Sequence, residues 1–159
     1  MEIRSDLRET DQPAIRQLLD ESGFFYPFET EVVMDIFEET LLKGSEASGY
    51  YWCLLEEGGK LAGFANFGPN PVTLHSWDLY WLAVRENLKN SGLGTRLLTR
   101  TEETARLKGG KILWVETSGR ALYQPTVAFY HRRGYALEAT LPEYYGPADP
   151  KLIFRKSLT

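Results

Sequence analysis

A glycine-bearing loop joins an apolar segment to a helical one in the sequence Val84-Arg85-Glu86-Asn87-Leu88-Lys89-Asn90-Ser91-Gly92-Leu93-Gly94-Thr95. Just upstream, Trp77 to Val84 is apolar and aromatic enough to form a buried strand. Just downstream, apolar or small residues recur at the spacing of one helix face, at Leu93, Leu97, Leu98, Thr101 and Ala105. The loop therefore leads directly into the N-terminus of a helix.

Such a helix start favours a bound anion. The first amides of a helix have no intrahelical partner, and the helix dipole places about half a positive charge there. Gly92 and Gly94 lack β-carbons, so they permit unusual dihedral angles and a close approach of the backbone to ligand oxygens. Lys89 and Arg96 add positive charge. The loop suits a pyrophosphate, although a purely structural turn would also explain the two glycines taken alone.

Two other phosphate-binding motifs do not fit this loop. A Walker A loop requires Lys followed by Ser or Thr directly after its last glycine, where this chain has Thr95 and Arg96. The dinucleotide-binding fingerprint requires a third glycine, where Leu97 stands.

The pattern Leu82-x-Val84-x-x-x-x-Lys89-x-x-Gly92-x-Gly94 resembles the acyl-CoA signature of the GNAT superfamily of N-acetyltransferases. Glu86 takes the position of the usual proline, and Lys89 that of the usual arginine or glutamine. A second segment, Phe129-Tyr130-His131-Arg132-Arg133-Gly134-Tyr135, resembles the C-terminal helix and strand motif of the same family. The resemblance covers essentially the whole chain in element order.

This resemblance implies an α/β fold in one domain over residues 1–159. The fold has a central, mostly antiparallel sheet with a splayed strand pair, flanked by helices. Acetyl-CoA is the implied acyl donor, with no metal. Backbone groups of Leu82 and Val84 would bind its pantetheine arm, and Lys89 would supply the positive charge of the signature. The amides that would hold the pyrophosphate belong to Asn90, Ser91, Gly92, Leu93, Gly94 and Thr95.

Acetyl transfer to an amine requires a base, because an alkyl ammonium titrates near ~10. Asp78 is the first candidate, as the isolated charge in an apolar strand, and a position at the exposed strand start or beside an arginine is its structural alternative. Glu116 is the second candidate. The family's tyrosine general acid corresponds to Tyr130, whose phenol at its usual pKa of ~10 would protonate the leaving thiolate; a packed helix aromatic is the alternative. Tyr123 stands where many relatives have an asparagine that contacts the cofactor.

In this fold the acceptor walls come from the segment between the first two helices and from the loop between the last two strands. Phe25 and Tyr26 on one side, with Glu116 and Tyr145 on the other, are the acceptor-binding candidates. Aromatic neighbours at Phe24, Phe28 and Tyr144 and carboxylates at Glu143 and Asp149 would enclose an apolar or cationic amine. The aromatic residues would equally well close the edge of the core.

Composition limits the other possibilities. The 159 residues carry a net charge of −4 and no long basic run, which argues against a nucleic-acid partner. Cys53 lies in an apolar run and is expected to be a buried thiol, while His75 and His131 lack the spacing of a metal site. No segment approaches ~20 continuous apolar residues, and the N-terminus lacks the apolar region of a secretion signal, so we expect a cytoplasmic protein with no membrane partner.

Periodicity and turn residues predict strands and helices in the order of a mixed α/β domain. Strands are expected at residues 2–7, 50–56, 60–67, 77–84, 111–117, 135–141 and 151–158. Helices are expected at residues 11–21, 30–42 and 125–133, and a central helix from residue 93 ends at Gly109-Gly110.

The chain is thus expected to be an acetyl-CoA-dependent N-acetyltransferase that acts by direct attack in a ternary complex. Its acceptor would be the primary amine of a small molecule, an amino acid or a peptide. Two alternatives remain: a non-catalytic acyl-CoA-binding sensor or scaffold, and an acetyltransferase of protein lysines or N-termini. A homodimer is compatible with each of these three functions.

Overall fold

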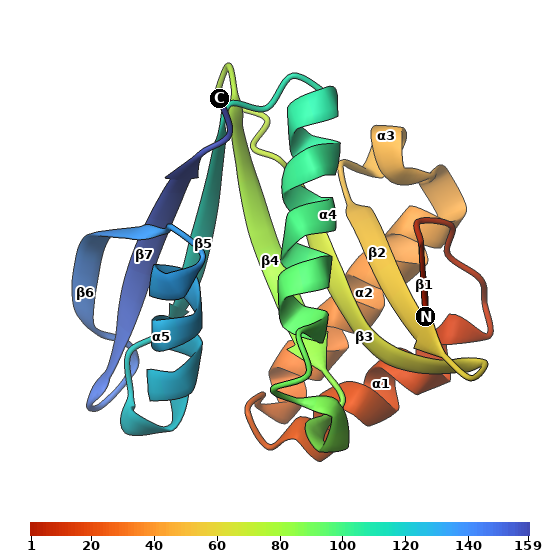
Figure 1. Ribbon diagram of the computed structural model, residues 1–159, viewed down its shortest axis with the longest axis horizontal. Helices are drawn as coiled ribbons and strands as arrows, with labels where there is room; N and C mark the ends of the chain where they lie inside the picture. The colour runs from red at the N-terminus through yellow and green to blue at the C-terminus, as the bar shows by residue number, and fades with distance from the viewer.

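The computed structural model describes residues 1–159 as a seven-stranded mixed sheet with helices on both faces (Figure 1). The strands are β1 (Glu2–Arg4), β2 (Tyr51–Glu57), β3 (Lys60–Pro69), β4 (Ser76–Val84), β5 (Ile112–Ser118), β6 (Ala136–Gly146) and β7 (Asp149–Ser157). The helices are α1 (Asp11–Ser22), α2 (Pro27–Lys43), α3 (Ser45–Ser48), α4 (Leu93–Leu107) and α5 (Gln124–Arg132), with short 3-10 turns η1 (Glu86–Leu88) and η2 (Ala121–Tyr123). The strand order is β1-β2-β3-β4-β5-β7-β6.

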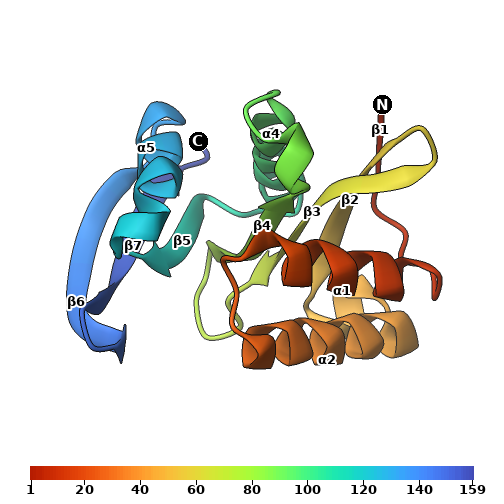
Figure 2. The ribbon, with the colours of Figure 1, turned by 90° about the horizontal axis from the view of Figure 1, so that it is seen from below.

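The helices form two layers. Seen from below, α1 and α2 lie on one side of the sheet and α4 and α5 on the other (Figure 2). Each face has its own buried cluster: Ile15, Val33 and Phe37 pack with the sheet beneath α1 and α2, whereas Leu97 and Leu98 pack with it beneath α4. The amphipathic spacing of these residues is therefore explained by burial of one stripe of each helix.

A β-bulge in β4 changes which side chains face which helices. Asn66 of β3 pairs with Trp81, but the next residue, Phe67, pairs with Leu79, so Tyr80 is an extra residue on β4. Before the bulge, Leu79 packs with the α4 cluster, and after it Trp81 packs with the α1–α2 cluster. Because side chains alternate along a strand, the bulge places both Tyr80 and Trp81 toward α1 and α2.

β4 and β5 separate along their length. They are the parallel pair of the sheet, and their pairing runs only from Ser76 opposite Ile112 to Leu79 opposite Val115. β4 continues to Val84 and β5 to Ser118 without partners in each other. This divergence, visible at the centre of Figure 1, confirms the expected splayed strand pair.

Helix α2 begins earlier than the periodicity predicted, at Pro27 instead of residue 30. Proline is favoured in the first helical turn, because its missing N–H would have no partner there. The Tyr26 N–H also donates to the Glu29 carboxylate over 2.8 Å, which forms a capping box. The aromatic run that we read as a linker is thus partly the first turn of α2.

Other boundaries differ at the ends of elements. The strand expected at residues 2–7 ends at Arg4, the one expected at 135–141 extends to Gly146, and α3 was not predicted. α3 is only four residues long, and its flanking residues Gly44 and Gly49 both have positive φ angles. One turn of helix has too few residues for a hydrophobic period to be recognised.

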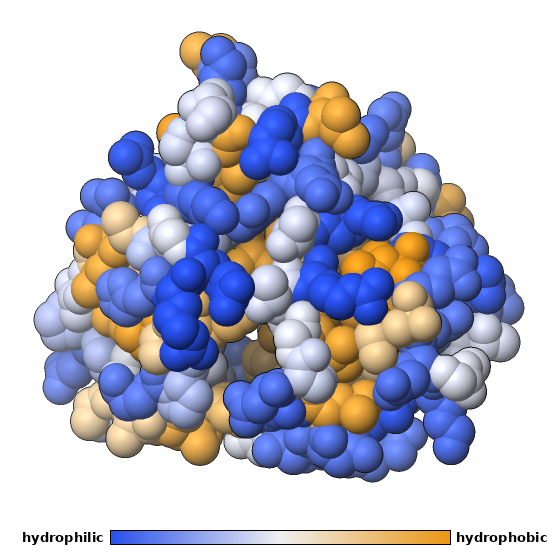
Figure 3. Space-filling view, viewed as in Figure 1, coloured by the Kyte–Doolittle hydropathy of each residue, from blue (hydrophilic) through white to orange (hydrophobic).

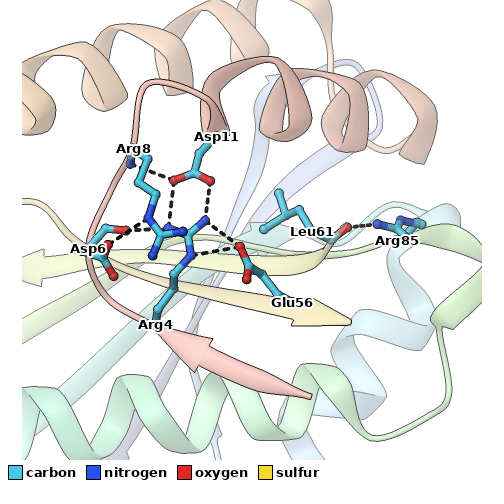
Figure 4. Close-up of polar contacts among 7 residues, drawn as sticks. All are labelled: Arg4, Asp6, Arg8, Asp11, Glu56, Leu61 and Arg85. Atoms are coloured by element: carbon cyan, nitrogen blue, oxygen red, sulfur yellow. Dashed lines mark hydrogen bonds and ion pairs between the residues drawn. The ribbon is translucent and has the colours of Figure 1, made fainter. Parts of the chain in front are cut away.

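Arg4 fastens the N-terminal strand to α1 and β2 (Figure 4). Its guanidinium forms ion pairs with Asp11 at the start of α1 and with Glu56 on β2, and it donates to the backbone oxygen of Asp6 over 2.6 Å. The Asp11 carboxylate also accepts the Arg8 N–H over 2.8 Å. These charges are largely buried, so the network depends on every partner being present.

Candidate functional site

A cavity of about 540 Å³ opens where β4 and β5 separate. Figure 3 shows the surface hollowed between the two halves of the molecule, below the centre of the view. Besides β4 and β5, its walls include the α1–α2 connection, η2, α5 and the ends of β6 and β7. Among the residues expected from the sequence, the wall contains Asp78, Leu82, Val84, Lys89, Glu116, Tyr130, Phe25, Tyr26 and Tyr145.

The main chain of β4 is free where the strands diverge. The Arg85 N–H donates to the Ala62 oxygen of β3 over 2.8 Å. Since backbone groups alternate in direction along a strand, those of Val84 and Leu82 point away from β3, toward β5. β5 does not pair with β4 beyond Leu79, so these N–H and C=O groups have no strand partner.

The loop after β4 leads into a helix whose start is not capped. Gly92 is the N-cap of α4, with a left-handed φ of 82°, and no side chain caps the helix. The first amides of α4, from Leu93 to Thr95, therefore have no intrahelical acceptor. Asn90 also has a positive φ, of 62°, which is uncommon for a non-glycine residue. The loop Asn90–Thr95 lies beyond Lys89, outside the cavity wall itself.

The two glycines of the loop differ in their backbone. Gly94 lies within α4, and a β-carbon there would lie 3.5 Å from the Phe129 ring, an ordinary contact. Of the two glycines, only Gly92 therefore uses the unusual dihedral angles that glycine permits. Leu93 is buried in the core, so only its main chain is available to a ligand.

Lys89 already has partners within the chain. Its ammonium lies 2.6 Å from the Glu86 carboxylate and 4.1 Å from the centre of the Phe24 ring. Glu86, which stands at the position of the signature's usual proline, starts η1 and pairs with the cation that the signature provides. An anionic ligand at Lys89 would therefore compete with Glu86.

Tyr130 is both a packed aromatic and a wall residue of the cavity. Its side chain is 4% exposed, and its ring contacts those of Phe129, Tyr135 and Phe154. Burial raises the pKa of its phenol well above the usual value. The ordinary pKa assumed from the sequence was therefore too low, and this hydroxyl stays protonated throughout the neutral range.

Asp78 lies on β4 opposite Trp114, where β4 and β5 are still paired, and it lines the cavity. Burial raises the pKa of its carboxyl. The side-chain amide of Asn70 lowers this pKa as a hydrogen-bond donor, and the charge of Glu116 raises it. Asp78 has no ion-pair partner within 4 Å in the chain, which is the arrangement expected of a base and not of a structural salt bridge.

Glu116 lines the same cavity from β5, but its charge is compensated. The Lys151 ammonium of β7 lies 2.6 Å from the Glu116 carboxylate and 4.1 Å from the centre of the Tyr144 ring. Because this carboxylate is already engaged by an ion pair, Glu116 is the weaker candidate for a base. The expected acceptor contacts at Glu143 and Tyr144 do not line the cavity, whereas Tyr145 and Asp149 do.

A bridge between two walls of the cavity was not predicted. The Tyr123 hydroxyl, at the position where relatives have an asparagine, donates to the Phe24 oxygen over 2.6 Å, and the two rings form an edge contact at 5.3 Å. Arg120 donates to the Tyr26 hydroxyl over 3.0 Å. The bridge joins the α1–α2 connection to η2, two segments about a hundred residues apart that no local pattern relates.

No group of three or more His, Cys, Asp or Glu side chains is arranged to hold a metal ion. None of the helices is long and apolar enough to cross a membrane. Cys53 is buried, and burial raises the pKa of its thiol to about 12.

Comparisons with known proteins agree with this geometry. The model of the "Acetyltransferase (GNAT) family" matches residues 13–135, while no curated protein matches the chain. The chain is similar to a proposed GNAT acetyltransferase from Desulfovibrio desulfuricans, with 37% identity over 99% of each chain and a TM-score of 0.95.

More distant structures share the fold. An aminoglycoside 6'-N-acetyltransferase complexed with coenzyme A is 19% identical, with a TM-score of 0.79 over 100% of this chain and 98% of that one. The ribosomal-protein-S18-alanine N-acetyltransferase from Escherichia coli is 22% identical, with a TM-score of 0.79 over 99% and 94%. With a family model that matches most of its length and a close structural relative, the chain belongs to the GNAT family of acetyltransferases, which use acetyl-CoA.

Proposed function

We propose that the protein transfers an acetyl group from acetyl-CoA to the primary amine of a small, cationic acceptor, using residues 1–159 as one domain. The observation that carries this proposal is the convergence of an unpaired carboxylate and a protonated phenol on one cavity. Asp78 comes from β4 and Tyr130 from α5, and both line the space that opens where β4 and β5 diverge.

On the donor side, the free main-chain groups of Leu82 and Val84 would pair with the amides of the pantetheine arm, much as another strand would. The uncapped start of α4 would hold the pyrophosphate through the amides of Leu93, Gly94 and Thr95. Asn90, Ser91 and Gly92 shape the approach to these amides, and Lys89 would exchange Glu86 for the phosphate charge.

In the reaction, Asp78 would take a proton from the acceptor ammonium, directly or through water, so that a neutral amine attacks. A backbone amide near Val84 would stabilise the negative charge that develops on the carbonyl oxygen. Tyr130 would give its proton to the departing thiolate. Acetyl-CoA supplies the acetyl group as a thioester and leaves as the thiol.

The acceptor walls favour a small cation. Phe25, Tyr26 and Tyr145 contribute aromatic surface, and Glu29 and Asp149 contribute carboxylates in addition to Asp78. The fourth carboxylate of the wall, Glu116, is paired with Lys151. Of the cations on the wall, Lys89 is ion-paired with Glu86, which leaves Arg120 to offset the other three carboxylates. Aromatic faces and excess negative charge attract ammonium groups. The bridge from Tyr123 to Phe24 joins two walls of the cavity, and we expect this closure to disfavour a folded protein as the acceptor.

Calorimetric titration with acetyl-CoA, followed by thiol-release assays, tests the proposal. The panel contains alkyl monoamines, diamines, amino acids and short peptides, each beside its N-acetylated form as the control. Binding with turnover of a small cationic amine supports the proposal. Turnover of peptides alone would favour protein acetylation, and binding without any turnover would favour a sensor or scaffold. Absence of binding would overturn the assignment of the loop at Gly92.

A further inference from the structure

Asn70 is a cavity residue that the proposed reaction does not yet use. It follows β3, in the segment Gly68-Pro69-Asn70-Pro71 that the sequence presents only as a break between strands. Its backbone N–H donates to the Ser76 oxygen at the start of β4 over 2.9 Å. Asn70 thus occupies a fixed place at the end of the β3–β4 ladder, although it belongs to a connection.

The strand register brings Asn70 beside Asp78. Gly68 pairs with Asp78, and Pro69 pairs with Trp77, so Asn70 stands diagonally across from Asp78 on the same face. Gly68 has no side chain to separate them. A β-carbon at Gly68 would lie 2.0 Å from the Gly49 oxygen, so no larger residue fits there without moving the backbone.

The side-chain amide of Asn70 has a defined orientation. Its Oδ1 accepts the Val72 N–H over 3.2 Å. An amide group has one acceptor and one donor end, so engagement of the oxygen leaves the Nδ2 hydrogens for the other side. By the strand register Asp78 is the diagonal neighbour of this amide, which lowers the pKa of the Asp78 carboxyl as a hydrogen-bond donor.

We propose that Asn70 is a positioning residue, whose side-chain amide aims the Asp78 carboxylate at the acceptor amine and keeps it ionised in its half-buried site. This inference rests on the proposed role of Asp78 as the base. A carboxylate that must collect a proton has to be anionic before the reaction, and a buried carboxylate without a donor is harder to keep charged. The Asn70 amide supplies that donor without adding a positive charge, which would form an ion pair with Asp78 in competition with the acceptor ammonium.

The other polar groups near Asp78 do not perform this task. Glu116 on β5 repels a second negative charge, although Lys151 of β7 pairs with it. Tyr80, on β4 itself, and Tyr145 from β6 remain neutral because burial raises the pKa of both phenols, but neither hydroxyl forms a hydrogen bond with Asp78. Glu29 from α2 lines the cavity as a further carboxylate and has no proton to donate when ionised.

Direct titration of the Asp78 carboxyl tests the inference without an identified acceptor. The chain has six aspartates, so the side-chain carboxyl ¹³C signal of Asp78 can be assigned by its loss in Asp78→Asn. In Asn70→Ala we expect its midpoint to rise by about half a pH unit or more, because the donor is lost. Asn70→Asp, which keeps the shape but replaces the donor by a carboxylate, should raise it further.

A matched control is available in the same turn. The Thr73 hydroxyl accepts the Ser76 N–H over 3.2 Å and donates to the backbone oxygen of Asn70 over 3.0 Å. Thr73→Val therefore loosens the turn but keeps the side-chain amide of Asn70. Its Asp78 midpoint should stay at the wild-type value. An equal shift in Thr73→Val and Asn70→Ala, or no shift in either Asn70 variant, would overturn the inference.

Activity separates this inference from the proposed function. With any acceptor that turns over, the acid limb of the rate profile should move to higher pH in Asn70→Ala by the same amount as the carboxyl midpoint, because the base must be ionised. If Asp78→Asn keeps full activity, the base assignment fails, whatever Asn70 does to the titration. If Asp78→Asn is inactive but Asn70→Ala has an unchanged acid limb, the positioning role fails alone.

Discussion

At the scale of single residues, burial changes the chemistry of side chains whose type the sequence already displays. The motif assigns Tyr130 as a general acid. In the structure this residue is buried in the core, and burial raises the pKa of its phenol. Asp78 is an isolated charge in the sequence. In the structure it is half-buried, and both burial and the nearby charge of Glu116 raise the pKa of its carboxyl. Both environments arise from residues distant in the chain.

Replacing Tyr130 by Phe should remove the proton donor while keeping the packed ring. We expect kcat to fall by ~100-fold or more, with the acetyl-CoA dissociation constant nearly unchanged. Tyr135→Phe is the matched control, because Tyr135 contacts Tyr130 but donates its hydroxyl to Glu102 over 2.8 Å, outside the cavity. Steady-state kinetics and calorimetry would expose a mere packing role as equal losses in turnover and binding.

The Arg4 network gives a stability prediction at the same scale. Asp11→Ala should lower the free energy of unfolding by about 2–4 kcal/mol, because it leaves a buried guanidinium with Glu56 as its remaining carboxylate. Asp6→Ala, which removes an exposed pair with Arg8, should cost less than about 1 kcal/mol. Denaturant unfolding measures both, and similar losses would show that burial does not govern the network.

At the scale of elements, the useful features are the places where regular structure stops. β4 loses β5 as a partner after Leu79, and α4 starts without a cap at Gly92. Each interruption leaves backbone N–H groups without acceptors, and such groups are costly to leave unpaired when buried. A ligand that supplies amide and phosphate oxygens satisfies both interruptions at once.

The two loop glycines can be separated by experiment at this scale. Gly92→Ala should destabilise the fold by about 1 kcal/mol, because alanine disfavours the left-handed φ of 82°. Gly94→Ala should stabilise it by about 0.5–1 kcal/mol, because residue 94 is helical and its β-carbon meets only Phe129.

Acetyl-CoA affinity should nevertheless fall in Gly94→Ala, if the pyrophosphate approaches this backbone as proposed. Thermal unfolding gives the stability and calorimetry gives the affinity. Wild-type affinity in Gly94→Ala would place the pyrophosphate away from residue 94.

At the scale of the whole molecule, the β5–β7–β6–α5 half joins the rest of the sheet through four residue pairs of β4 and β5. The bridge from Tyr123 to Phe24 closes the other end of the gap. A ligand seated between the halves would therefore hold them together as an additional connection.

Acetyl-CoA at a hundred times its dissociation constant should stabilise the whole fold by about 2.7 kcal/mol. The rise in Tm should be matched by slower amide exchange in both halves, at β4 and at α5. Desulfo-coenzyme A, which lacks the sulfur but retains the pyrophosphate, is a control for the contribution of the thiol end. Protection confined to α4 would argue against a ligand that spans the gap.

Local patterns were sufficient for the order of the helices and strands, apart from the one-turn helix α3, and for the glycine-bearing loop before α4. The periodicity of α1, α4 and β4 and the glycine at residue 92 express short-range constraints, so the sequence alone determined the element order, the GNAT resemblance and the loop before α4. Only the tertiary structure decided which side chains meet. The pairing of Glu116 with Lys151, the bridge from Tyr123 to Phe24 and the placement of Asn70 beside Asp78 depend on strand register and sheet closure. These contacts join residues that no spacing rule relates, because they are set by packing of the whole chain and not by its local backbone preferences.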